Sequence, residues 1–474
     1  MLHQFYHLSA NSFLSFSMLS SANNKAKIYR PFWLVLFVFI FCITASLLPT
    51  GFSLFGIDFK PVDFLSDFTK NSLHKKKKEQ IVESKNTISA ADSLHYKGVA
   101  FENFYPSNKN LLLQFIDKLN ALKKKKSKIH IAWFGDSMVE GDLFVQDLRN
   151  NLQNEFGGDG VGFVPITSVV GNFRQTIFTQ NSGDWKTVSV LKNEQHKLPL
   201  GIGGEAFIPQ NGSWVSFSAV NKKHLAIFHQ AELFLFNPNK VTSIDLLIDD
   251  VTTKHIEIPV SSSLQKIDLG IGKYFQHIKI SFNADSGFYA YGVNFESENG
   301  VFVDNFGVRG SSGIAIGAMQ PYSLLNDWKN LHNYDLIILE YGLNVVSPKT
   351  NKYDWFQKSF PKAIDKITDN YSESAVLLLS LGDRAVNKNG EYATMEQVPI
   401  FIDIQKNISQ TQQIAFWNMF DAMGGEGSMA NWVNEKPRLA NKDYTHINAK
   451  GGEVLGQKLF DAILFEVKKR ELNL

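Results

Sequence analysis

The sequence predicts an α/β protein with a parallel sheet, an all-β insertion and an apolar N-terminal span. Apolar runs that alternate with helical patterns recur at residues 129–135, 336–339 and 375–380, which is typical of parallel strands joined by helices. Between residues 173 and 302 the apolar residues alternate or form short blocks separated by turns, without helical spacing. Residues 32–48 carry no charged side chain, which indicates a membrane segment.

Length and composition set the outer limits of these predictions. A chain of 474 residues exceeds what one hydrophobic core supports, so two folded domains and a tail are expected. The formal net charge is +2, and this near-neutral balance gives no indication of nucleic-acid binding. The chain has one cysteine, Cys42, so it contains no disulfide framework.

The N-terminal region predicts a membrane anchor. Residues 1–30 are polar and unpatterned and form a predicted cytoplasmic tail. Residues 31–50 form the predicted transmembrane helix, whose uncharged stretch is at the short limit for crossing a bilayer. Lys25, Lys27 and Arg30 precede it, so the positive-inside tendency places the N-terminus in the cytoplasm. A cleaved signal peptide is the alternative, but the long polar lead favours an uncleaved anchor.

Residues 51–99 predict a flexible linker. They are rich in Ser, Lys, Asp and Asn and include the run Lys75–Lys78. A lysine run is usually only solvated, although it can also contact anionic lipid or cell-wall polymers. With an anchor before it, this linker would set the distance between the membrane and the folded domains on the extracytoplasmic, periplasmic side.

The first candidate for catalysis follows the predicted strand Ile129–Gly135. Four apolar residues recur at helical spacing after that strand: Phe144, Leu148, Leu152 and Phe156. Ser137 therefore lies at a strand-to-helix turn, where unpaired backbone N–H groups can receive the oxyanion that forms when a hydroxyl attacks a carbonyl. The alternative is structural, because Asp136 or Ser137 can simply cap the helix.

Residues 173–302 predict an inserted β-sandwich of the jelly-roll type, because strand-like runs follow one another at short intervals. Such sandwiches often hold sugars against aromatic side chains, although an aromatic residue more often belongs to the core. The candidates for sugar contact are Trp185, Trp214, Tyr274, Phe288 and Tyr289. The insertion divides the α/β domain into residues 100–172 and 303–474.

The carboxyl ends of the later strands are the predicted location of the site, because ligands of open parallel sheets bind there. Asp383 and Arg384 follow the strand at 375–380, and this pair can contact substrate or form a structural salt bridge. The glycine-rich stretch Met423–Met429 predicts a mobile loop at the wall of the substrate pocket. Its pocket candidates are Gly424 and Gly425.

Asp443 and His446 complete a candidate catalytic set. A serine nucleophile needs a base, and the base needs an acceptor that fixes its tautomer. His446 is the only histidine after His332, and Asp443 precedes it by three residues, so one loop can present both side chains. A solvated Asp-x-x-His pair is the structural alternative, and the combination with Ser137 favours catalysis.

Four motifs in this order resemble those of the SGNH, or GDSL-type, hydrolases. They are Gly135-Asp136-Ser137, Asp304–Gly310, Gly342-Leu343-Asn344-Val345 and Asp443-x-x-His446. The inserted sandwich makes the chain similar to one branch, the peptidoglycan and polysaccharide O-acetylesterases, and the resemblance implies a three-layer, flavodoxin-like fold. One departure is Val345, which stands where an aspartate often follows the asparagine. We expect this change to alter loop bracing rather than abolish activity.

The resemblance also implies roles for individual residues. The implied catalytic triad is Ser137, His446 and Asp443. The implied oxyanion hole consists of Ser137, Gly310 and Asn344. The substrate-pocket candidates are Asp136, Arg309, Asp383, Gly424 and Gly425. The expected reaction removes O-acetyl groups from a cell-wall or extracellular polysaccharide through an acyl-serine, and its rate should rise with pH through about 6–7 because the base must be neutral.

No cofactor and no metal are expected, because the sequence has no histidine and cysteine cluster with metal-ligand spacing. The expected partners are an acetylated glycan and, through the N-terminal helix, a membrane. Two other functions would use the same features. An O-acyltransferase would pass the acyl group from Ser137 to a glycan instead of water, and a non-catalytic carbohydrate-binding module would use the insertion alone.

Overall fold

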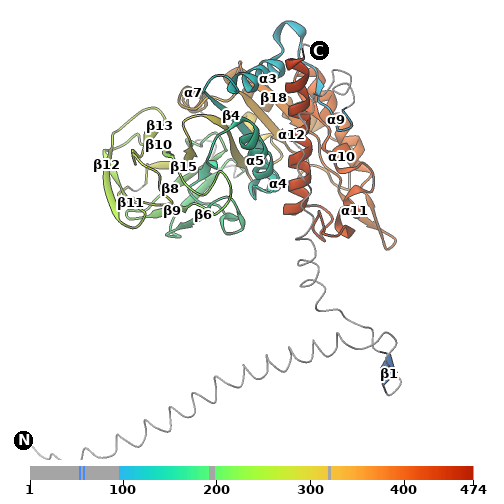
Figure 1. Cartoon of the computed structure of the whole chain (residues 1–474), viewed down its shortest axis with the longest axis horizontal. Coiled ribbons are helices and arrows are strands. Elements are labelled where there is room, and N and C mark those ends of the chain that lie inside the picture. The colour runs from blue at the N-terminus through green and yellow to red at the C-terminus, as the bar shows by residue number, and fades with distance from the viewer. Residues whose placement is uncertain are drawn as a thin grey trace, which may run out of the picture. The chain divides into compact units, whose positions relative to one another are not determined.

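The computed structural model describes residues 53–54, 57–58, 96–191, 198–284, 286–318 and 322–472. Within the predicted linker, β1 (Ser53–Leu54) pairs antiparallel with β2 (Ile57–Asp58). None of the helices in the described ranges combines the length and the apolar character that a membrane crossing needs. The predicted tail at 1–30 and the predicted anchor at 31–50 lie outside these ranges. From Tyr96 onwards the chain forms a helix-covered sheet with an attached β-sandwich (Figure 1).

A six-stranded sheet in the order β16-β4-β17-β18-β21-β3 forms the centre of the α/β domain. The strands are β16 (Gly300–Gly307), β4 (Lys128–Gly135), β17 (Leu336–Glu340), β18 (Ala375–Leu379), β21 (Ala415–Trp417) and β3 (Glu102–Asn103). The edge strand β3 is antiparallel, and the other strands are parallel. Numbered along the chain, the parallel strands lie in the order 2-1-3-4-5, which is the flavodoxin-like order.

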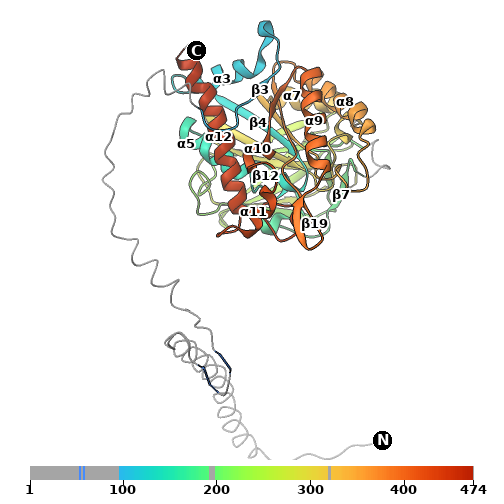
Figure 2. The same ribbon diagram turned by 90° about the vertical axis from the view of Figure 1, so that its right-hand side faces the viewer.

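Helices cover both faces of this sheet, and the alternation of apolar residues along the strands explains why. In β4, Ile131 and Trp133 face one core, while Ala132 and Phe134 face the other. The first core includes side chains of α3 (Leu111–Leu122), α5 (Val145–Phe156) and α12 (Ala449–Glu471). The second includes side chains of α7 (Tyr322–Leu331), α8 (Asp354–Asn370) and α9 (Gln397–Thr411). Figure 2 shows α5 and α12 on one side of β4 and α8 and α9 on the other.

The insertion is a β-sandwich of two antiparallel sheets. One sheet contains β13 (Gln265–Asp268), β10 (Gln230–Phe236), β15 (Tyr289–Glu296), β8 (Glu205–Ile208), β7 (Lys186–Ser189) and β5 (Gly162–Pro165). The other contains β12 (Thr252–Ile258), β11 (Thr242–Ile248), β14 (His277–Phe282), β9 (Trp214–Ser218) and β6 (Phe178–Asn181). Side chains of both sheets share one core, in which the ring centroids of Phe217 and Phe295 lie 5.3 Å apart.

The insertion begins and ends earlier in the chain than the predicted limits of 173 and 302. β5 already pairs with β15 of the sandwich, whereas Gly300 begins a strand of the central sheet. The glycine-rich turn before β5 makes this start possible. Gly160 has a φ of 123°, and a Cβ atom there would lie 2.2 Å from the carbonyl oxygen of Phe295. Only glycine therefore fits where the chain enters the sandwich.

The predicted linker also ends earlier than residue 99. The ring of Tyr96 stacks on Phe465 of α12, with 4.7 Å between the ring centroids. The carbonyl oxygen of Val99 accepts a hydrogen bond of 2.9 Å from the indole N–H of Trp417 in β21. Residues 96–99 therefore belong to the α/β domain.

A buried cluster of charged side chains joins the sandwich to the α/β domain. Glu296, at the end of β15, is 3 % exposed, and its carboxylate lies 3.0 Å from His130 Nε2 and 2.9 Å from Lys128 Nζ. His332 Nε2 lies 3.8 Å from the same carboxylate and 3.0 Å from Asp304. Burial alone would raise the pKa of Glu296, but His130, His332 and Lys128 hold it well below its ordinary value. The carboxylate therefore stays ionised between the domains.

We expect Glu296→Gln to lower the free energy of unfolding by about 3 kcal/mol, because it leaves buried basic groups without their carboxylate. Chemical denaturation of the two proteins measures this difference. Glu257→Gln, at an exposed position of β12, is the matched control and should change the free energy by less than about 0.5 kcal/mol. Equal effects of the two substitutions would show that the cluster does not stabilise the fold.

Candidate active site

Ser137 directly follows the carboxyl end of β4, and the residues before it determine its position. A Cβ atom at Gly135 would lie 2.2 Å from a valine side chain of the following turn, so no larger residue fits there. Asp136 accepts a hydrogen bond of 3.0 Å from the Met138 N–H and caps α4 (Ser137–Glu140). The capping interpretation of the motif thus holds for Asp136, and it leaves the hydroxyl of Ser137 free for another contact.

The helix expected after the serine is interrupted. α4 ends at Glu140, and α5 begins only at Val145. Between them Asp142 has a φ of 62°, and its buried carboxylate forms two hydrogen bonds of 2.9 and 3.0 Å with Arg149. The macrodipole of a helix as short as α4 is small, so individual N–H donors near Ser137 matter more than the helix end.

The structure brings together Ser137, His446 and Asp443. Ser137 Oγ lies 3.1 Å from His446 Nε2, and His446 Nδ1 lies 2.8 Å from Asp443 Oδ2. The second oxygen of Asp443 accepts hydrogen bonds of 3.0 Å from the backbone N–H groups of Thr445 and His446. In this arrangement the imidazole can take the serine proton while the carboxylate holds the ring in place.

Asp443 is suited to hold the imidazole. Partial burial alone would raise its pKa, but the hydrogen bonds from His446 and Thr445 bring the pKa below its ordinary value. The carboxylate is therefore ionised at neutral pH and favours a proton on His446 Nδ1. That tautomer leaves Nε2 as the acceptor for the serine hydroxyl.

Tyr444 fixes the loop that carries this pair. Its φ of 55° turns the chain between Asp443 and His446. Its ring stacks on Tyr392 of β20 (Glu391–Thr394), with 3.4 Å between the ring centroids. Its carbonyl oxygen accepts a hydrogen bond of 3.0 Å from the N–H of Ala385, at the start of β19 (Ala385–Lys388). The β19–β20 hairpin therefore supports the histidine.

The expected oxyanion donors lie around the same serine. Asn344 Nδ2 donates hydrogen bonds of 3.1 Å to Asp136 Oδ2 and to the carbonyl oxygen of Ser311. Gly310, with a φ of 81°, immediately precedes Ser311. Within the described ranges the backbone N–H groups of Ser137 and Gly310 have no acceptor. Asn344 thus links the serine turn to the Gly310 segment, and two N–H groups remain for a developing oxyanion.

The valine that replaces the expected aspartate is part of the core. Val345 is buried, and the Asn344 loop is braced from another element. Arg384 Nη1 lies 3.4 Å from the carbonyl oxygen of Leu343 and 3.3 Å from that of Val346. In this chain an arginine side chain, and not an aspartate next to the asparagine, holds the backbone on both sides of Asn344.

A cleft of about 610 Å³ contains Ser137, Asn344 and His446. Both domains contribute to its walls. Val169 and Phe173, which follow β5, are 79 % and 76 % exposed and line it from the insertion. The predicted pocket residue Arg309 lines the cleft from the α/β domain, and its guanidinium pairs with Glu140 at 3.0 Å.

The aromatic candidates of the sandwich do not line this cleft. They are Trp185, Trp214, Tyr274, Phe288 and Tyr289. Phe288, for example, is buried in the sandwich core, and Tyr274 packs on His229. Sequence reasoning missed Phe173, whose only signal is a large apolar side chain in a polar stretch between two strands.

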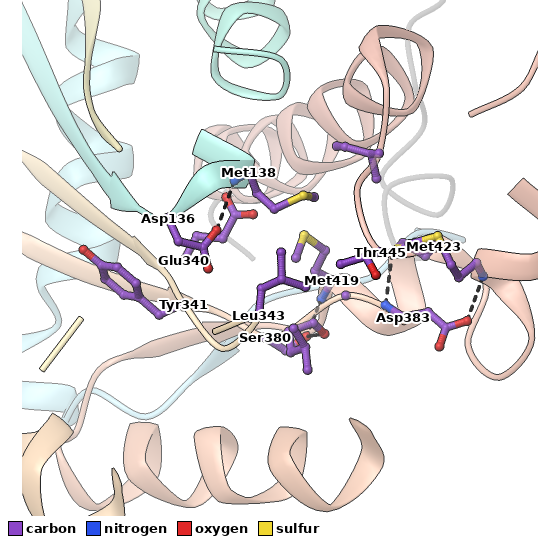
Figure 3. A pocket seen from close by; sticks show the side chains of 14 residues that line it. Asp136, Met138, Glu340, Tyr341, Leu343, Ser380, Asp383, Met419, Met423 and Thr445 are labelled. Carbon is purple, nitrogen blue, oxygen red and sulfur yellow. Dashed lines mark hydrogen bonds between the residues drawn. The ribbon is translucent and has the colours of Figure 1, made fainter. Parts of the chain in front are cut away.

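A smaller cavity of about 20 Å³ lies beside the cleft (Figure 3). Four residues line both spaces: Met138, Leu343, Thr445 and Ile447. Its lining also includes three further methionines and three acidic residues: Met419, Met423, Met429, Asp136, Glu340 and Asp383. A space of this size holds about one water molecule or one methyl group.

Asp383 and Arg384 do not form the salt bridge considered from the sequence. The Asp383 carboxylate accepts a hydrogen bond of 2.7 Å from the Met429 N–H, at the start of α11 (Ser428–Asn434). Burial raises the pKa of Asp383 despite this bond. Asp383 therefore acts within the fold, and it meets the site only as a wall of the small cavity.

The expected mobile loop at Met423–Met429 is a turn between two helices. α10 (Met419–Met423) ends at Gly424, and α11 begins at Ser428. Gly424 and Gly425 have φ values of 118° and 76°, and neither lines the cleft or the small cavity. The glycines serve the turn, while the methionines on either side of it reach the cavity.

Two buried carboxyl groups lie behind the serine. Burial raises the pKa of Asp136 to about 6, although Met138 and Asn344 donate hydrogen bonds to it. Burial and the neighbouring Asp136 raise the pKa of Glu340 to about 8, and Trp133 Nε1 donates to Glu340 at 3.1 Å. Glu340 is therefore mostly protonated at neutral pH, whereas Asp136 is mostly ionised.

Among the residues that the structure describes, one group has the composition of a metal site. The ligand atoms of His130, Glu296 and His332 lie within 4.8 Å of one another. Lys128 already pairs with this glutamate. His130 lies near the amino end of β4, and strand geometry places it roughly 20 Å from Ser137. The group belongs to the contact between the domains and not to the candidate active site.

The raised pKa of Asp136 predicts a pH-dependent cost in stability. Folding favours its neutral form, so its stabilising contribution is present below the ordinary pKa of 3.8 and is lost as the pH rises through about 6. The free energy of unfolding of Asp136→Asn, measured relative to the wild type, should increase by roughly 2 kcal/mol when the pH rises from 4 to 7. Urea denaturation at both pH values measures it.

Asp403→Asn, at an exposed position of α9, is the matched control for this comparison. A difference between Asp136→Asn and the wild type that is the same at both pH values would contradict the prediction.

Comparison with known proteins shows what fold this is. A solved peptidoglycan O-acetylesterase has a TM-score of 0.62 and 18 % identity over 78 % of this chain and 99 % of its own. A family two carbohydrate esterase from Cellvibrio japonicus reaches a TM-score of only 0.25, with 10 % identity over 62 % of this chain and 98 % of its own. No family model and no curated protein matches the sequence. The first likeness confirms the expected resemblance at the level of the fold, because the chain shares the fold of that peptidoglycan O-acetylesterase.

Proposed function

We propose that the protein is a serine esterase that removes O-acetyl groups from a cell-wall or extracellular polysaccharide. The observation that carries the proposal is the contact of 3.1 Å between Ser137 Oγ and His446 Nε2, with Asp443 2.8 Å from the other ring nitrogen. The fold shared with a peptidoglycan O-acetylesterase supports it. The predicted anchor at 31–50 would place the cleft on the extracytoplasmic side, where such polysaccharides lie.

The reaction proceeds through an acetylated serine. Ser137 Oγ attacks the acetyl carbonyl carbon while His446 Nε2 takes the hydroxyl proton. The bond between the carbonyl carbon and the sugar oxygen then breaks, and the imidazolium gives its proton to that oxygen. Water, deprotonated by the same imidazole, then attacks the carbonyl carbon of the acetyl-serine. The bond from that carbon to Ser137 Oγ breaks, the imidazolium returns its proton to Oγ, and acetate leaves. Asp443 orients the ring and stabilises its charged form throughout.

The oxyanion of each tetrahedral intermediate needs donors at the serine turn. The backbone N–H groups of Ser137 and Gly310 and the amide of Asn344 are the proposed donors. Because Asn344 already donates to Asp136 and to the Ser311 carbonyl, an oxyanion shares one of these hydrogens or takes it over. Loss of one such donor typically lowers turnover by about 10²–10³-fold.

The exposed apolar wall of the cleft suits a polymeric substrate. Phe173 and Val169 give an apolar wall to the same cleft that contains the reacting serine. Exposed apolar side chains gathered in a cleft mark a binding surface more often than a solvated one. A sugar ring next to the acetylated one can pack its C–H groups on this wall, which a small free ester could not reach.

We expect Ser137→Ala to reduce acetate release from isolated cell wall and secreted polysaccharide by about 10⁴-fold or more, because the acetyl group then has no acceptor. Released acetate measured with purified protein tests this. Ser262→Ala, at an exposed serine of the sandwich, is the matched control and should keep full activity. Undiminished release by Ser137→Ala would refute the assignment.

The small cavity supports acetate as the acyl group. It adjoins the cleft at Met138 and Leu343, and its volume of about 20 Å³ accepts a methyl group but not a longer chain. A pocket that is one methylene too small discriminates by about 10–100-fold. The cavity therefore predicts an esterase selective for acetyl groups.

We expect the wild type to prefer 4-nitrophenyl acetate over the butyrate by at least about tenfold in kcat/KM. Met138→Ala removes a side chain that separates the cavity from the cleft, so it should reduce this ratio severalfold. The ratio of the two esters serves as its own control for folding and enzyme concentration. Equal rates with acetate, butyrate and hexanoate in the wild type would count against an acetyl pocket.

A further inference from the structure

The lining of the cleft is basic. It contains two arginines, Arg309 and Arg384, and no aspartate or glutamate. Arg309 pairs with Glu140, which neutralises its charge within the protein. Arg384 forms no ion pair with any residue in the described ranges, and its hydrogen bonds go to backbone carbonyl groups. The cleft therefore presents one half-buried positive charge without a counter-charge.

Arg384 is held in a defined position. Its carbonyl oxygen accepts a hydrogen bond of 2.8 Å from the Met395 N–H, and the N–H of the next residue, Ala385, donates to Tyr444. One guanidinium nitrogen contacts the carbonyl groups on both sides of Asn344 at 3.3 and 3.4 Å. The remaining N–H groups have no acceptor within the described part of the chain. A fixed guanidinium with free donors is preorganised to bind an anion.

This charge lies next to both halves of the catalytic site. The carbonyl groups that Arg384 contacts flank Asn344, and the backbone beside it is bonded to Tyr444, two residues before His446. Arg384 and Ser137 line the same cleft. An anionic group at Arg384 would therefore belong to the sugar that carries the acetyl group or to an adjoining sugar.

We propose that the substrate is an acidic glycan and that Arg384 binds a carboxylate on the acetylated sugar or on its neighbour. This inference rests on the proposed esterase function and adds the substrate class to it. A guanidinium matches the two oxygens of a carboxylate with parallel N–H donors, which gives both orientation and affinity. A neutral glycan would cover the guanidinium and leave its charge unpaired, which is unfavourable. The cleft thus distinguishes uronic-acid polymers from neutral ones.

Arg384 also braces the Asn344 loop, and kinetics separate the two roles. Weaker bracing lowers kcat for every ester, because the oxyanion donor is then misplaced. Loss of an anion contact raises KM for acidic substrates alone, because binding of the carboxylate is the same in the ground state and the transition state.

The test compares three substrates: O-acetylated polygalacturonate, the same polymer with its carboxyl groups reduced to alcohols before acetylation, and 4-nitrophenyl acetate. We expect the wild type to prefer the acidic polymer over the reduced one by about tenfold or more in kcat/KM. Arg384→Gln should lower kcat/KM for the acidic polymer by about 10–100-fold, mainly through KM. For the other two substrates it should lower kcat through weaker bracing, as it does for the acidic polymer, while their KM stays within about threefold. Added salt should weaken the acidic preference of the wild type only.

Two further variants test whether the effect comes from the charge of Arg384 and from its position in the cleft. Arg384→Lys retains the charge and should keep part of the acidic preference. Arg438→Gln, at an exposed position outside the cleft, is the matched control and should behave as the wild type. Equal losses on all three substrates in Arg384→Gln would leave only the bracing role and overturn the proposal. Equal use of the acidic and reduced polymers by the wild type would overturn it as well.

Failure of the proposed function is visible separately, as a lack of acetate release from any ester. In that case calorimetric binding of a galacturonate oligosaccharide to the Ser137→Ala protein still tests the anion site. Binding that is lost when Arg384→Gln is added supports the site. An absence of binding, or binding that survives the added substitution, rejects it.

Discussion

The hydrogen bond between Ser137 and His446 depends on how closely the last helix approaches the first catalytic turn. A Cβ atom at Gly452 would lie 2.0 Å from the Leu143 carbonyl oxygen, and one at Gly456 would lie 2.6 Å from Asp147. These glycines allow α12 to pack against the start of α5, and α12 begins three residues after His446. The parallel sheet fixes the serine, and this helix contact fixes the histidine. The C-terminal helix can therefore lie directly against the segment that follows Ser137, because Gly452 and Gly456 have no side chains at the contact.

The region behind the serine shows how function opposes stability. Asp136 accepts a hydrogen bond from Asn344, yet its burial favours the neutral form of the carboxyl group, and burial together with Asp136 raises the pKa of Glu340. A half-buried Arg384 without a counter-charge adds a further unfavourable contribution until a ligand arrives. By contrast, Glu296 between the domains pairs with Lys128 and His130. The charges between the domains are therefore paired within the protein, whereas Arg384 at the cleft has no ion-pair partner among the described residues.

Short motifs were sufficient to predict that Ser137, Asp443 and His446 lie together, because Ser137 follows a strand and Asp443 shares a loop with His446. The order of the sheet followed from the resemblance, and the flavodoxin-like order is present. Other features depended on partners that local patterns do not reveal. The glycine-rich turn near Gly160 serves contact with β15, and Asp383 caps a helix instead of pairing with Arg384. Gly424 and Gly425 form a turn between helices, because glycine composition does not distinguish a turn from a mobile loop. Phe173 lines the cleft because the insertion that carries it folds next to the α/β domain, and no local pattern predicts that contact.

The central claim is that Ser137 is a nucleophile activated by a histidine from the far end of the chain. Intact mass and peptide mapping after treatment with a fluorophosphonate probe test it most directly, because this probe reacts with activated serines and needs no knowledge of the substrate. We expect one adduct per molecule, located on Ser137, and a much slower reaction in His446→Gln. An unlabelled wild-type protein, or labelling at the same rate without the histidine, would contradict the account.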